Sequence, residues 1–204
     1  MAYRTVEGAV EAEVVEKKSR FIAHLAHVET EEEALAFLDG VRSENQQARH
    51  NVYAYLLRSG RTRYSDDGEP AQTSGMPTFQ VLERAGLADV ICVTTRYFGG
   101  VLLGTGGLVR AYTQAAQTAL AIARIVSVER CVDISVSVPY PEHDAVVRRI
   151  QEAGARVQGS AYSDKVQLDV RVLEADADAL MRALTEASRG QAALEATAPF
   201  DAPF

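Results

Sequence analysis

The chain has 204 residues, a formal net charge of −7 and two cysteines, and these properties exclude several classes of protein. No run of about 18 apolar residues is present, so we expect no transmembrane helix and no membrane partner. The acidic balance argues against a protein that coats nucleic acid, double-stranded DNA included, because such affinity depends on phosphate neutralisation by Lys and Arg. Cys92 and Cys131 lie in apolar runs without ligand spacing, which indicates reduced thiols and a cytoplasmic location.

Strands and helices alternate over residues 1–126, and their order predicts a first α+β domain of two layers. The expected strands are residues 21–28, 52–57 and 90–97. The expected helices are residues 30–41, 77–84 and 108–124. Thr30 is the expected N-cap of the first helix, because Glu33 follows three residues later as in a capping box.

Strict alternation of apolar and polar residues begins near residue 126 and predicts a second domain over residues 127–204. The strands at 128–138 and 166–172 have one apolar face, and two helices lie at about 141–154 and 174–189. The order strand, helix, strand, strand, helix, strand is that of a ferredoxin-like βαββαβ domain. A short linker is expected at 125–130.

The polar face of this second sheet carries no aromatic residue, and Tyr162 is the only aromatic residue expected nearby. RNA-binding sheets of this fold stack bases on aromatic side chains. We therefore favour a hydrated face, or one that docks on a protein, over base stacking. The expected members of the face are Asp133, Ser135, Ser137, Lys165, Gln167, Asp169 and Arg171.

A basic run in the first domain is the local exception to the acidic charge, because no Asp or Glu lies between Glu44 and Asp66. Its members are Arg49, His50, Arg58, Arg61 and Arg63. Alternation places Arg49, Asn51 and two tyrosines on one strand face, a pattern that suits single-stranded nucleic acid. Strand tyrosines more often pack in a core, which we favour. His50 falls on the apolar side, which favours a buried histidine over a catalytic base.

Five glycines separate the strand at 90–97 from the helix that follows: Gly99, Gly100, Gly104, Gly106 and Gly107. A glycine-rich turn before a helix can direct backbone N–H groups at an anion, and Arg96 and Arg110 would be its partners. The spacing does not fit a Walker loop, because Thr105-Gly106 stands where Lys-Ser/Thr is required. Positive φ angles and tight packing are the alternative explanation.

Three carboxylates, Asp66, Asp67 and Glu69, precede Thr73 and Ser74 in a turn-rich segment. Carboxylates are the ligands that Mg²⁺ prefers, but Asp, Gly and Pro also favour turns, and no further ligand can be nominated. We favour the turn and expect no metal or cofactor. No Gly-x-Ser-x-Gly elbow or paired Cys and His is present, so no catalytic constellation is recognisable.

Four segments in chain order resemble the IMPACT family over nearly the whole chain. They are Glu16-Lys17-Lys18-Ser19-Arg20-Phe21; Ala48-x-His50-Asn51-x-Tyr53-Ala54-Tyr55; Asp66-Asp67-Gly68-Glu69-Pro70 with Thr73-Ser74-Gly75-x-Pro77; and Arg96-Tyr97-Phe98-Gly99-Gly100 with Leu103-Gly104-x-Gly106-Gly107-Leu108-x-Arg110-Ala111-Tyr112. Arg49 departs from the small hydroxyl residue that the family has beside the histidine.

The resemblance implies a left-handed βαβ fold for the N-terminal domain, as in the second domain of a small-subunit ribosomal protein. It implies a C-terminal domain like the fifth domain of elongation factor G. Eukaryotic members regulate translation by keeping an activator from a stress kinase. The implied functional surface contains Asp66, Asp67, Glu69, Arg96, Gly99, Gly104, Gly106 and Arg110.

Three hypotheses follow. The first is a non-enzymatic cytoplasmic protein that acts on translation through RNA, the ribosome or a translation-associated protein. The second is a Mg²⁺-dependent enzyme or sensor for a small phosphorylated ligand, using the turn at 66–69 and the loop at 99–107. The third is an adaptor that docks through the polar sheet face around Ser135 and Gln167.

Overall fold

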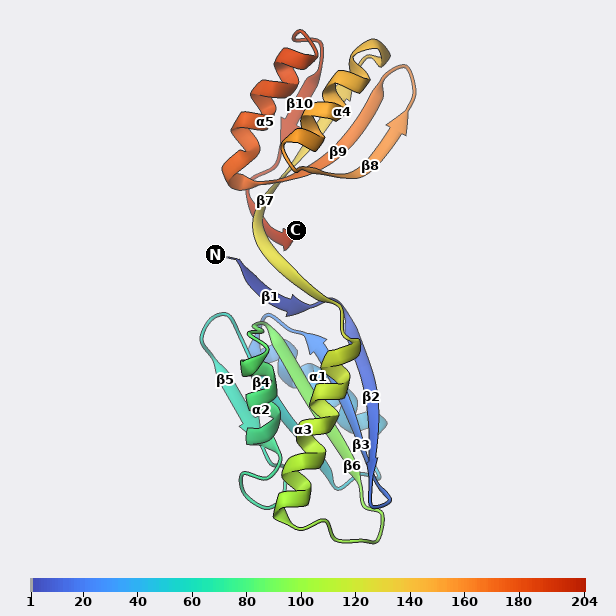
Figure 1. The fold of residues 1–204 in the computed structure, drawn as a ribbon, viewed down its shortest axis with the longest axis vertical. Coiled ribbons are helices and arrows are strands. Elements are labelled where there is room, and N and C mark those ends of the chain that lie inside the picture. The colour runs from blue at the N-terminus through green and yellow to red at the C-terminus, as the bar shows by residue number, and fades with distance from the viewer. Residues whose placement is uncertain (1) are drawn as a thin grey trace. The chain divides into compact units, whose positions relative to one another are not determined.

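The computed structural model describes residues 2–204, which divide into two compact units, Tyr3–Val126 and a second that contains Ser127–Phe204 (Figure 1). Each unit combines one β-sheet with helices packed on it. The expected α+β class with two domains is therefore confirmed. None of the helices among these residues is long and apolar enough to cross a membrane.

The first unit is built on a five-stranded sheet in the order β2-β3-β6-β4-β5, with every neighbouring pair antiparallel. Its strands are β2 (Ala9–Glu16), β3 (Ser19–His27), β4 (His50–Leu56), β5 (Thr62–Ser65) and β6 (Val90–Tyr97), and a short strand β1 (Tyr3–Val6) precedes them. The sequence analysis found β3, β4 and β6, which are buried nearly throughout. It missed β5, which has no buried residue, and β2, although apolar and acidic residues alternate over residues 10–14 of that strand.

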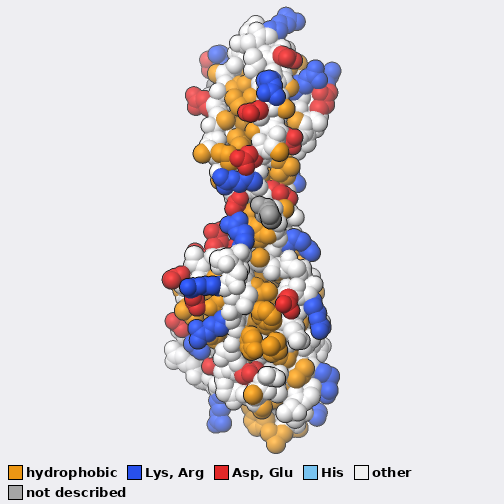
Figure 2. Space-filling model, turned by 90° about the vertical axis from the view of Figure 1, so that its left-hand side faces the viewer, with side chains coloured by type: hydrophobic (Ala, Val, Ile, Leu, Met, Phe, Trp, Pro, Cys, Tyr) orange, Lys and Arg blue, Asp and Glu red, His pale blue; other side chains and the backbone are white. Residues whose placement is uncertain are grey.

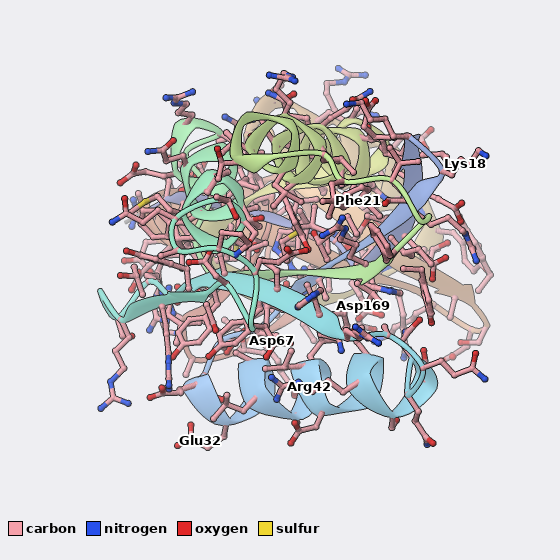
Figure 3. All side chains as sticks on the ribbon, turned by 90° about the horizontal axis from the view of Figure 1, so that it is seen from below. Lys18, Phe21, Glu32, Arg42, Asp67 and Asp169 are labelled. Atoms are coloured by element: carbon pink, nitrogen blue, oxygen red, sulfur yellow. The ribbon has the colours of Figure 1, made fainter. Side chains whose placement is uncertain are left out.

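Helices lie on both faces of this sheet, which adds a third layer to the two that were expected. They are α1 (Glu31–Glu44), α2 (Gly75–Arg84) and α3 (Thr105–Ile122). Seen from below, α1 lies on one side of the sheet and α2 and α3 on the other (Figure 3). The N-cap is confirmed, since Thr30 Oγ1 accepts from the Glu33 N–H at 3.1 Å.

The two tyrosines of β4 pack in the core beneath α1, as favoured from the sequence. Tyr53 is 6% exposed and Tyr55 is 2% exposed, and their rings stack at 6.4 Å. On the opposite face, Phe21 meets Tyr112 of α3 edge to face at 5.1 Å, and both side chains are buried. Aromatic pairs of this geometry stabilise a core beyond their buried area. The sheet of the first unit is therefore packed on both faces, and the loops at the ends of its strands are attached to a well-packed core.

The second unit has the strand order β10-β7-β9-β8, which is the ferredoxin-like order predicted from the sequence. Its elements are β7 (Ile125–Val138), a 3₁₀ turn (Tyr140–Glu142), α4 (His143–Glu152), β8 (Arg156–Tyr162), β9 (Val166–Leu173), α5 (Glu174–Ala187), β10 (Ala193–Ala196) and β11 (Phe200–Pro203). Both helices pack on one face of the sheet (Figure 1). The expected linker at 125–130 is instead strand, because β7 runs unbroken from Ile125.

The other face of this sheet is polar, but it is not free of aromatic residues as expected. Arg171 donates two hydrogen bonds to Asp133, at 2.8 and 2.9 Å, and its guanidinium lies 5.1 Å from the Phe200 ring. Arg156 lies in the same way 4.6 Å from the ring of Phe204. These rings come from β11 and the residue after it, beyond the last strand expected from the sequence. Each of these two half-exposed rings therefore already has an arginine against it.

Candidate functional site

A groove of about 650 Å³ lies at one end of the first unit, where β4 begins and β6 ends. Antiparallel pairing places His50 opposite Arg96 and so brings the ends of the two strands together. The groove is lined by Gln47, Arg49, His50, Arg96, Tyr97, Phe98 and Leu102. Three of the residues singled out in the sequence, Arg49, His50 and Arg96, therefore share one concave surface.

Arg96 is buried, at 7% exposure, and a single carboxylate neutralises its charge. Its Nη1 donates to Glu69 Oε1 at 2.7 Å, and the same oxygen accepts from the Tyr112 hydroxyl at 2.8 Å. The guanidinium lies 5.5 Å from the ring of Phe21 and 5.7 Å from that of Phe98. Arg96 Nε is buried without a hydrogen-bond partner among residues 2–204. Arg96 is thus held firmly, while part of its donor capacity is unused.

Burial, together with the neighbouring Glu69 carboxylate, raises the pKa of Tyr112 far above its ordinary value. The hydroxyl therefore stays protonated and donates a hydrogen bond to the Glu69 carboxylate. Glu69 is itself only 9% exposed, so both of its partners meet it away from solvent. Hydrogen bonds to an ionised acceptor in such surroundings are stronger than neutral ones. The acidic segment, which contains Asp66, Asp67 and Glu69, therefore supports Arg96 through Glu69 and does not itself line the groove.

His50 is half-buried, which corrects the expectation that it is a buried histidine. Its neighbours also define which ring nitrogen carries the hydrogen. Its Nδ1 lies 2.8 Å from the backbone carbonyl oxygen of Asp67. A carbonyl oxygen only accepts, so Nδ1 carries the hydrogen. Nε2 has no hydrogen-bond partner within the described chain, and the ring lines the groove. In the neutral form, His50 therefore presents an acceptor to the groove.

The loop that holds this carbonyl is fixed by the Asp67 carboxylate. Its Oδ2 accepts from the backbone N–H of Asn51 at 2.7 Å, and its Oδ1 accepts from Arg42 of α1 at 3.3 Å. Figure 3 labels Asp67 and Arg42 on facing elements. Asn51 is buried, and its side-chain oxygen accepts from Thr95 of β6 at 2.7 Å. Asp67 and Asn51 thus position His50 and do not themselves line the groove.

Asp66 caps helix α2. Its Oδ1 accepts from the Ser74 hydroxyl and from the N–H groups of Ser74 and Gly75, at 2.7 to 3.0 Å, and its Oδ2 accepts from the Gln72 N–H. Burial acts to raise the pKa of Asp66, but these hydrogen bonds together hold it below its ordinary value. Thr73 closes the same turn by donating to the Pro70 carbonyl at 2.7 Å. The turn and cap interpretation thus describes this segment.

The three carboxylates of the acidic segment therefore have separate partners. Asp66 binds the start of α2, Asp67 binds β4 and α1, and Glu69 binds Arg96 and Tyr112. Within residues 2–204, no three His, Cys, Asp or Glu side chains are grouped so that they could hold a metal ion. The acidic segment is consequently a structural support beside the groove.

The glycine loop is explained mainly by packing and backbone angles. A Cβ on Gly99 would lie 2.0 Å from the carbonyl carbon of Lys18, and the Gly99 N–H donates to Ser19 Oγ at 3.1 Å. Gly100 and Gly104 have φ angles of +84° and +72°, which only glycine adopts readily. These contacts join the loop to the turn between β2 and β3.

Helix α3 begins after this loop without a side-chain cap. Gly106 in its first turn is exposed, and a Cβ there would lie 3.5 Å from Arg110 Nη1. Gly104, Gly106 and Arg110 do not line the groove. The groove therefore does not support the hypothesis that Arg110 and the glycine loop bind an anion together.

The basic run also separates into paired and unpaired members. Arg61 and Arg63 lie against Glu31 of α1, and Arg58 lies 3.7 Å from Asp89. Arg49 is exposed and forms no ion pair or hydrogen bond with any residue that the structure describes. The single free arginine of the run is therefore the one at the groove.

Several residues of this surface were missed in the site predicted from the sequence. Phe98 is 57% exposed and Leu102 is 82% exposed, and both line the groove. Lys17 and Lys18, with φ angles of 46° and 66°, form the exposed turn that Gly99 packs against. The signal that could have found Phe98 and Leu102 is the run of large apolar residues beside the glycines at 98–103, of which only Leu103 joins the core.

Fold and groove together define a two-domain α+β protein with a basic groove at the end of its N-terminal unit. A domain described as the Impact N-terminal domain matches residues 17–120, and a domain of unknown function, DUF1949, matches residues 136–191. The chain belongs to the IMPACT family, which confirms the resemblance seen in its motifs.

Several relatives share nearly the whole chain. The IMPACT family member YvyE of Bacillus subtilis is 34% identical, over 93% of this chain and 88% of its own. The IMPACT family member YigZ of Escherichia coli is 35% identical, over 85% of this chain and 87% of its own. A solved structure described as a hypothetical protein has a TM-score of 0.63 and 31% identity, and the match covers 95% of this chain and 96% of that one.

Proposed function

We propose that this protein is a non-enzymatic cytoplasmic binding protein that acts on translation through RNA, the ribosome or a translation-associated protein. One observation carries the proposal: the groove is lined by the unpaired Arg49, by His50 and by Arg96, whose charge Glu69 balances from outside the lining, and by no Asp or Glu, in a chain of net charge −7. A concave surface of one charge sign concentrates ligands of the opposite sign. The groove therefore suits a ligand that carries phosphate or another anionic group.

The free cations around the groove extend this surface. Arg49 lines it, and the Lys17-Lys18 turn lies against the neighbouring glycine loop. Exposed Lys and Arg side chains supply most of the affinity of proteins for RNA, through phosphate neutralisation. The link to translation rests on the family to which the chain belongs and on folds that recur in ribosomal proteins and elongation factors.

The arrangement supports binding rather than catalysis. The carboxylates nearest the groove are already bound to protein groups, Glu69 to Arg96 and Asp67 to Asn51 and Arg42. Neither of them is free to act as a general acid or base on a ligand. The groove offers donors and an exposed aromatic ring, which are the groups that hold a ligand in place.

A sensor for a small phosphorylated ligand is the second candidate. The volume of about 650 Å³ favours it, because pockets for small ligands have about 300–1,000 Å³. The Mg²⁺ part of this alternative has no support from the acidic segment, whose carboxylates have other partners. Thermal-shift measurements with nucleotides and phosphosugars test it, and a shift that is lost in Arg49→Ala would favour the sensor.

Cosedimentation with ribosomes at low and moderate salt tests the first proposal. We expect the protein in the ribosomal fraction at low salt, with less of it there for Arg49→Glu. The matched control is Arg182→Glu, an equal change of charge at an exposed position on α5 of the other unit. Absence of the parent protein from the ribosomal fraction at both salt concentrations, or an equal loss for both variants, would contradict the proposal.

A further inference from the structure

Phe98 is an exposed aromatic ring in a position that a folded core does not explain. It is 57% exposed, it lines the groove, and one neighbour of its ring is the buried guanidinium of Arg96 at 5.7 Å. Leu102, on the same loop, is 82% exposed. Figure 2 shows hydrophobic side chains gathered at the lower end of the first unit. Exposed aromatic residues beside arginines are the platforms on which proteins stack unpaired bases.

The groove also separates hydrogen-bond donors from an acceptor. Arg49 and Arg96 contribute only donors. Neutral His50 contributes an acceptor, because its Nδ1–H is held by the Asp67 carbonyl and Nε2 is left open. A nucleotide of RNA has the complementary groups: a phosphate that only accepts, a 2′-hydroxyl that can donate, and a base with a flat apolar face.

We propose that the groove binds an unpaired nucleotide of RNA. The phosphate lies against Arg49 and Arg96, the ribose 2′-hydroxyl donates to His50 Nε2, and the base stacks on Phe98. Lys17 and Lys18, on the turn that packs against Gly99, contact the phosphates of the adjoining nucleotides. This inference rests on the proposed function and names the ligand class of the same site.

The observations favour an unpaired nucleotide over a duplex or an acidic peptide. A base inside a duplex is covered on both faces by its neighbours, so Phe98 could not stack on it. An acidic peptide would satisfy Arg49 and could donate a backbone N–H to His50 Nε2, but its carboxylates offer no flat ring to Phe98. The groove volume of about 650 Å³ also suits a single nucleotide unit.

Fluorescence anisotropy with a short single-stranded RNA tests the base contact. We expect Phe98→Ala to weaken binding by about 5- to 150-fold, from the 1–3 kcal/mol that stacking on one base contributes. Phe98→Tyr should retain most of the affinity. The matched control is Val101→Ala, which changes an apolar side chain on the same loop that is 42% exposed and does not line the groove. Its affinity should stay within about 2-fold of the parent, the ordinary effect of a surface change.

The phosphate and hydroxyl contacts have their own readouts. Arg49→Ala should reduce the slope of log affinity against log salt by about 0.7, the value for one phosphate contact on a single strand. DNA of the same sequence should bind more weakly than RNA, and His50→Ala should remove that difference by weakening RNA binding alone. Equal binding of RNA and DNA by the parent protein would overturn the assignment of His50.

Other outcomes overturn the nucleotide assignment as a whole. These are affinity for duplex RNA equal to that for the single strand, no effect of Phe98→Ala, or displacement of the RNA by polyglutamate at an equal concentration of charge. Ribosome cosedimentation separates this inference from the proposed function. If the protein sediments with ribosomes but binds no single-stranded RNA, only the nucleotide assignment fails. If it does neither, both fail.

Discussion

Replacement of Glu69 by glutamine tests the buried network that supports the groove. Glu69 accepts hydrogen bonds from Arg96 and Tyr112 at 2.7 and 2.8 Å, and all three side chains are buried. Glutamine has nearly the same shape and keeps an oxygen acceptor, but it has no charge. The substitution therefore leaves the Arg96 guanidinium buried without a counter-charge, at 7% exposure.

The expected loss of stability follows from this uncompensated charge. Breaking a buried ion pair by removing one partner costs about 3–5 kcal/mol. Arg96 lines the groove, so water can reach part of its guanidinium, and the glutamine oxygen still accepts one hydrogen bond. We therefore expect Glu69→Gln to lower the free energy of unfolding by about 2–3 kcal/mol. Loss of the Glu69 charge should also lower the pKa of Tyr112, because that carboxylate helps to raise it.

Equilibrium urea unfolding followed by circular dichroism measures the change. Glu83→Gln is the matched control: it makes the same chemical change on the exposed side of α2 and should cost less than about 0.5 kcal/mol. A double-mutant cycle of Glu69→Gln with Arg96→Met should give a coupling energy of about 1–3 kcal/mol. A loss for Glu69→Gln no larger than that for Glu83→Gln, or a coupling near zero, would refute the reasoning.

Three further predictions concern the supports of the site. Asp66→Asn should lower stability by about 1–2 kcal/mol at pH 7, because the amide NH₂ cannot accept from the Gln72 N–H as Oδ2 does and the remaining hydrogen bonds at α2 lose their ionised acceptor. The pKa of Asp66 is lowered in the folded state, so the contribution of its charge is present above its ordinary pKa of about 3.9 and is lost as the pH falls through the folded value. Thermal unfolding from pH 7 to pH 2 should therefore show the two proteins converging in acid. Gly99→Ala should destabilise by about 1–3 kcal/mol in the same urea assay, because its Cβ would lie 2.0 Å from the carbonyl carbon of Lys18. The control is Gly40→Ala in α1, whose Cβ meets nothing within 4 Å and which should stabilise by about 0.5–1 kcal/mol. No change in stability for Gly99→Ala would contradict the close packing. Burial raises the pKa of Cys92 to about 12, so its thiol should not react with Ellman's reagent until the protein unfolds, and reaction in the native state would show that β6 opens.

Local patterns were sufficient to predict most elements of the fold. The N-cap at Thr30 and the alternation along β7 and β9 act within a few residues, and both are present in the structure, although Glu33 accepts from the Glu29 N–H rather than from that of Thr30 as a capping box requires. In β2, Val10, Ala12 and Val14 alternate with Glu11 and Glu13, so the period-2 signal was present there and was not recognised. The strand β5 was missed because its four residues have no buried position and therefore no apolar face. The aromatic residues at the polar face of the second sheet were missed for a related reason, since Phe200 belongs to a strand of only four residues.

In the candidate site, too, some features were predictable from local sequence and others were not. The basic run singled out Arg49, and the family motifs singled out His50 and Arg96, but neither distinguished residues that line a groove from residues that support it. That distinction depends on contacts between segments far apart in the chain. Glu69 reaches Arg96, and the Asp67 carbonyl reaches His50, only after β4 and β6 have paired. The carboxylates of Asp66, Asp67 and Glu69 likewise take partners that only the fold brings to them.

The sequence by itself determined the α+β class, the ferredoxin-like order of the second unit and membership of the IMPACT family. These properties depend on periodicity, turn chemistry and motifs, each of which involves residues close together in the chain. Only the tertiary structure decided which charges remain free. Glu31 forms ion pairs with Arg61 and Arg63, and Glu69 forms one with Arg96, whereas Arg49 is unpaired at the groove among the described residues. Charge pairing depends on distances in space, and strand register and helix packing set those distances.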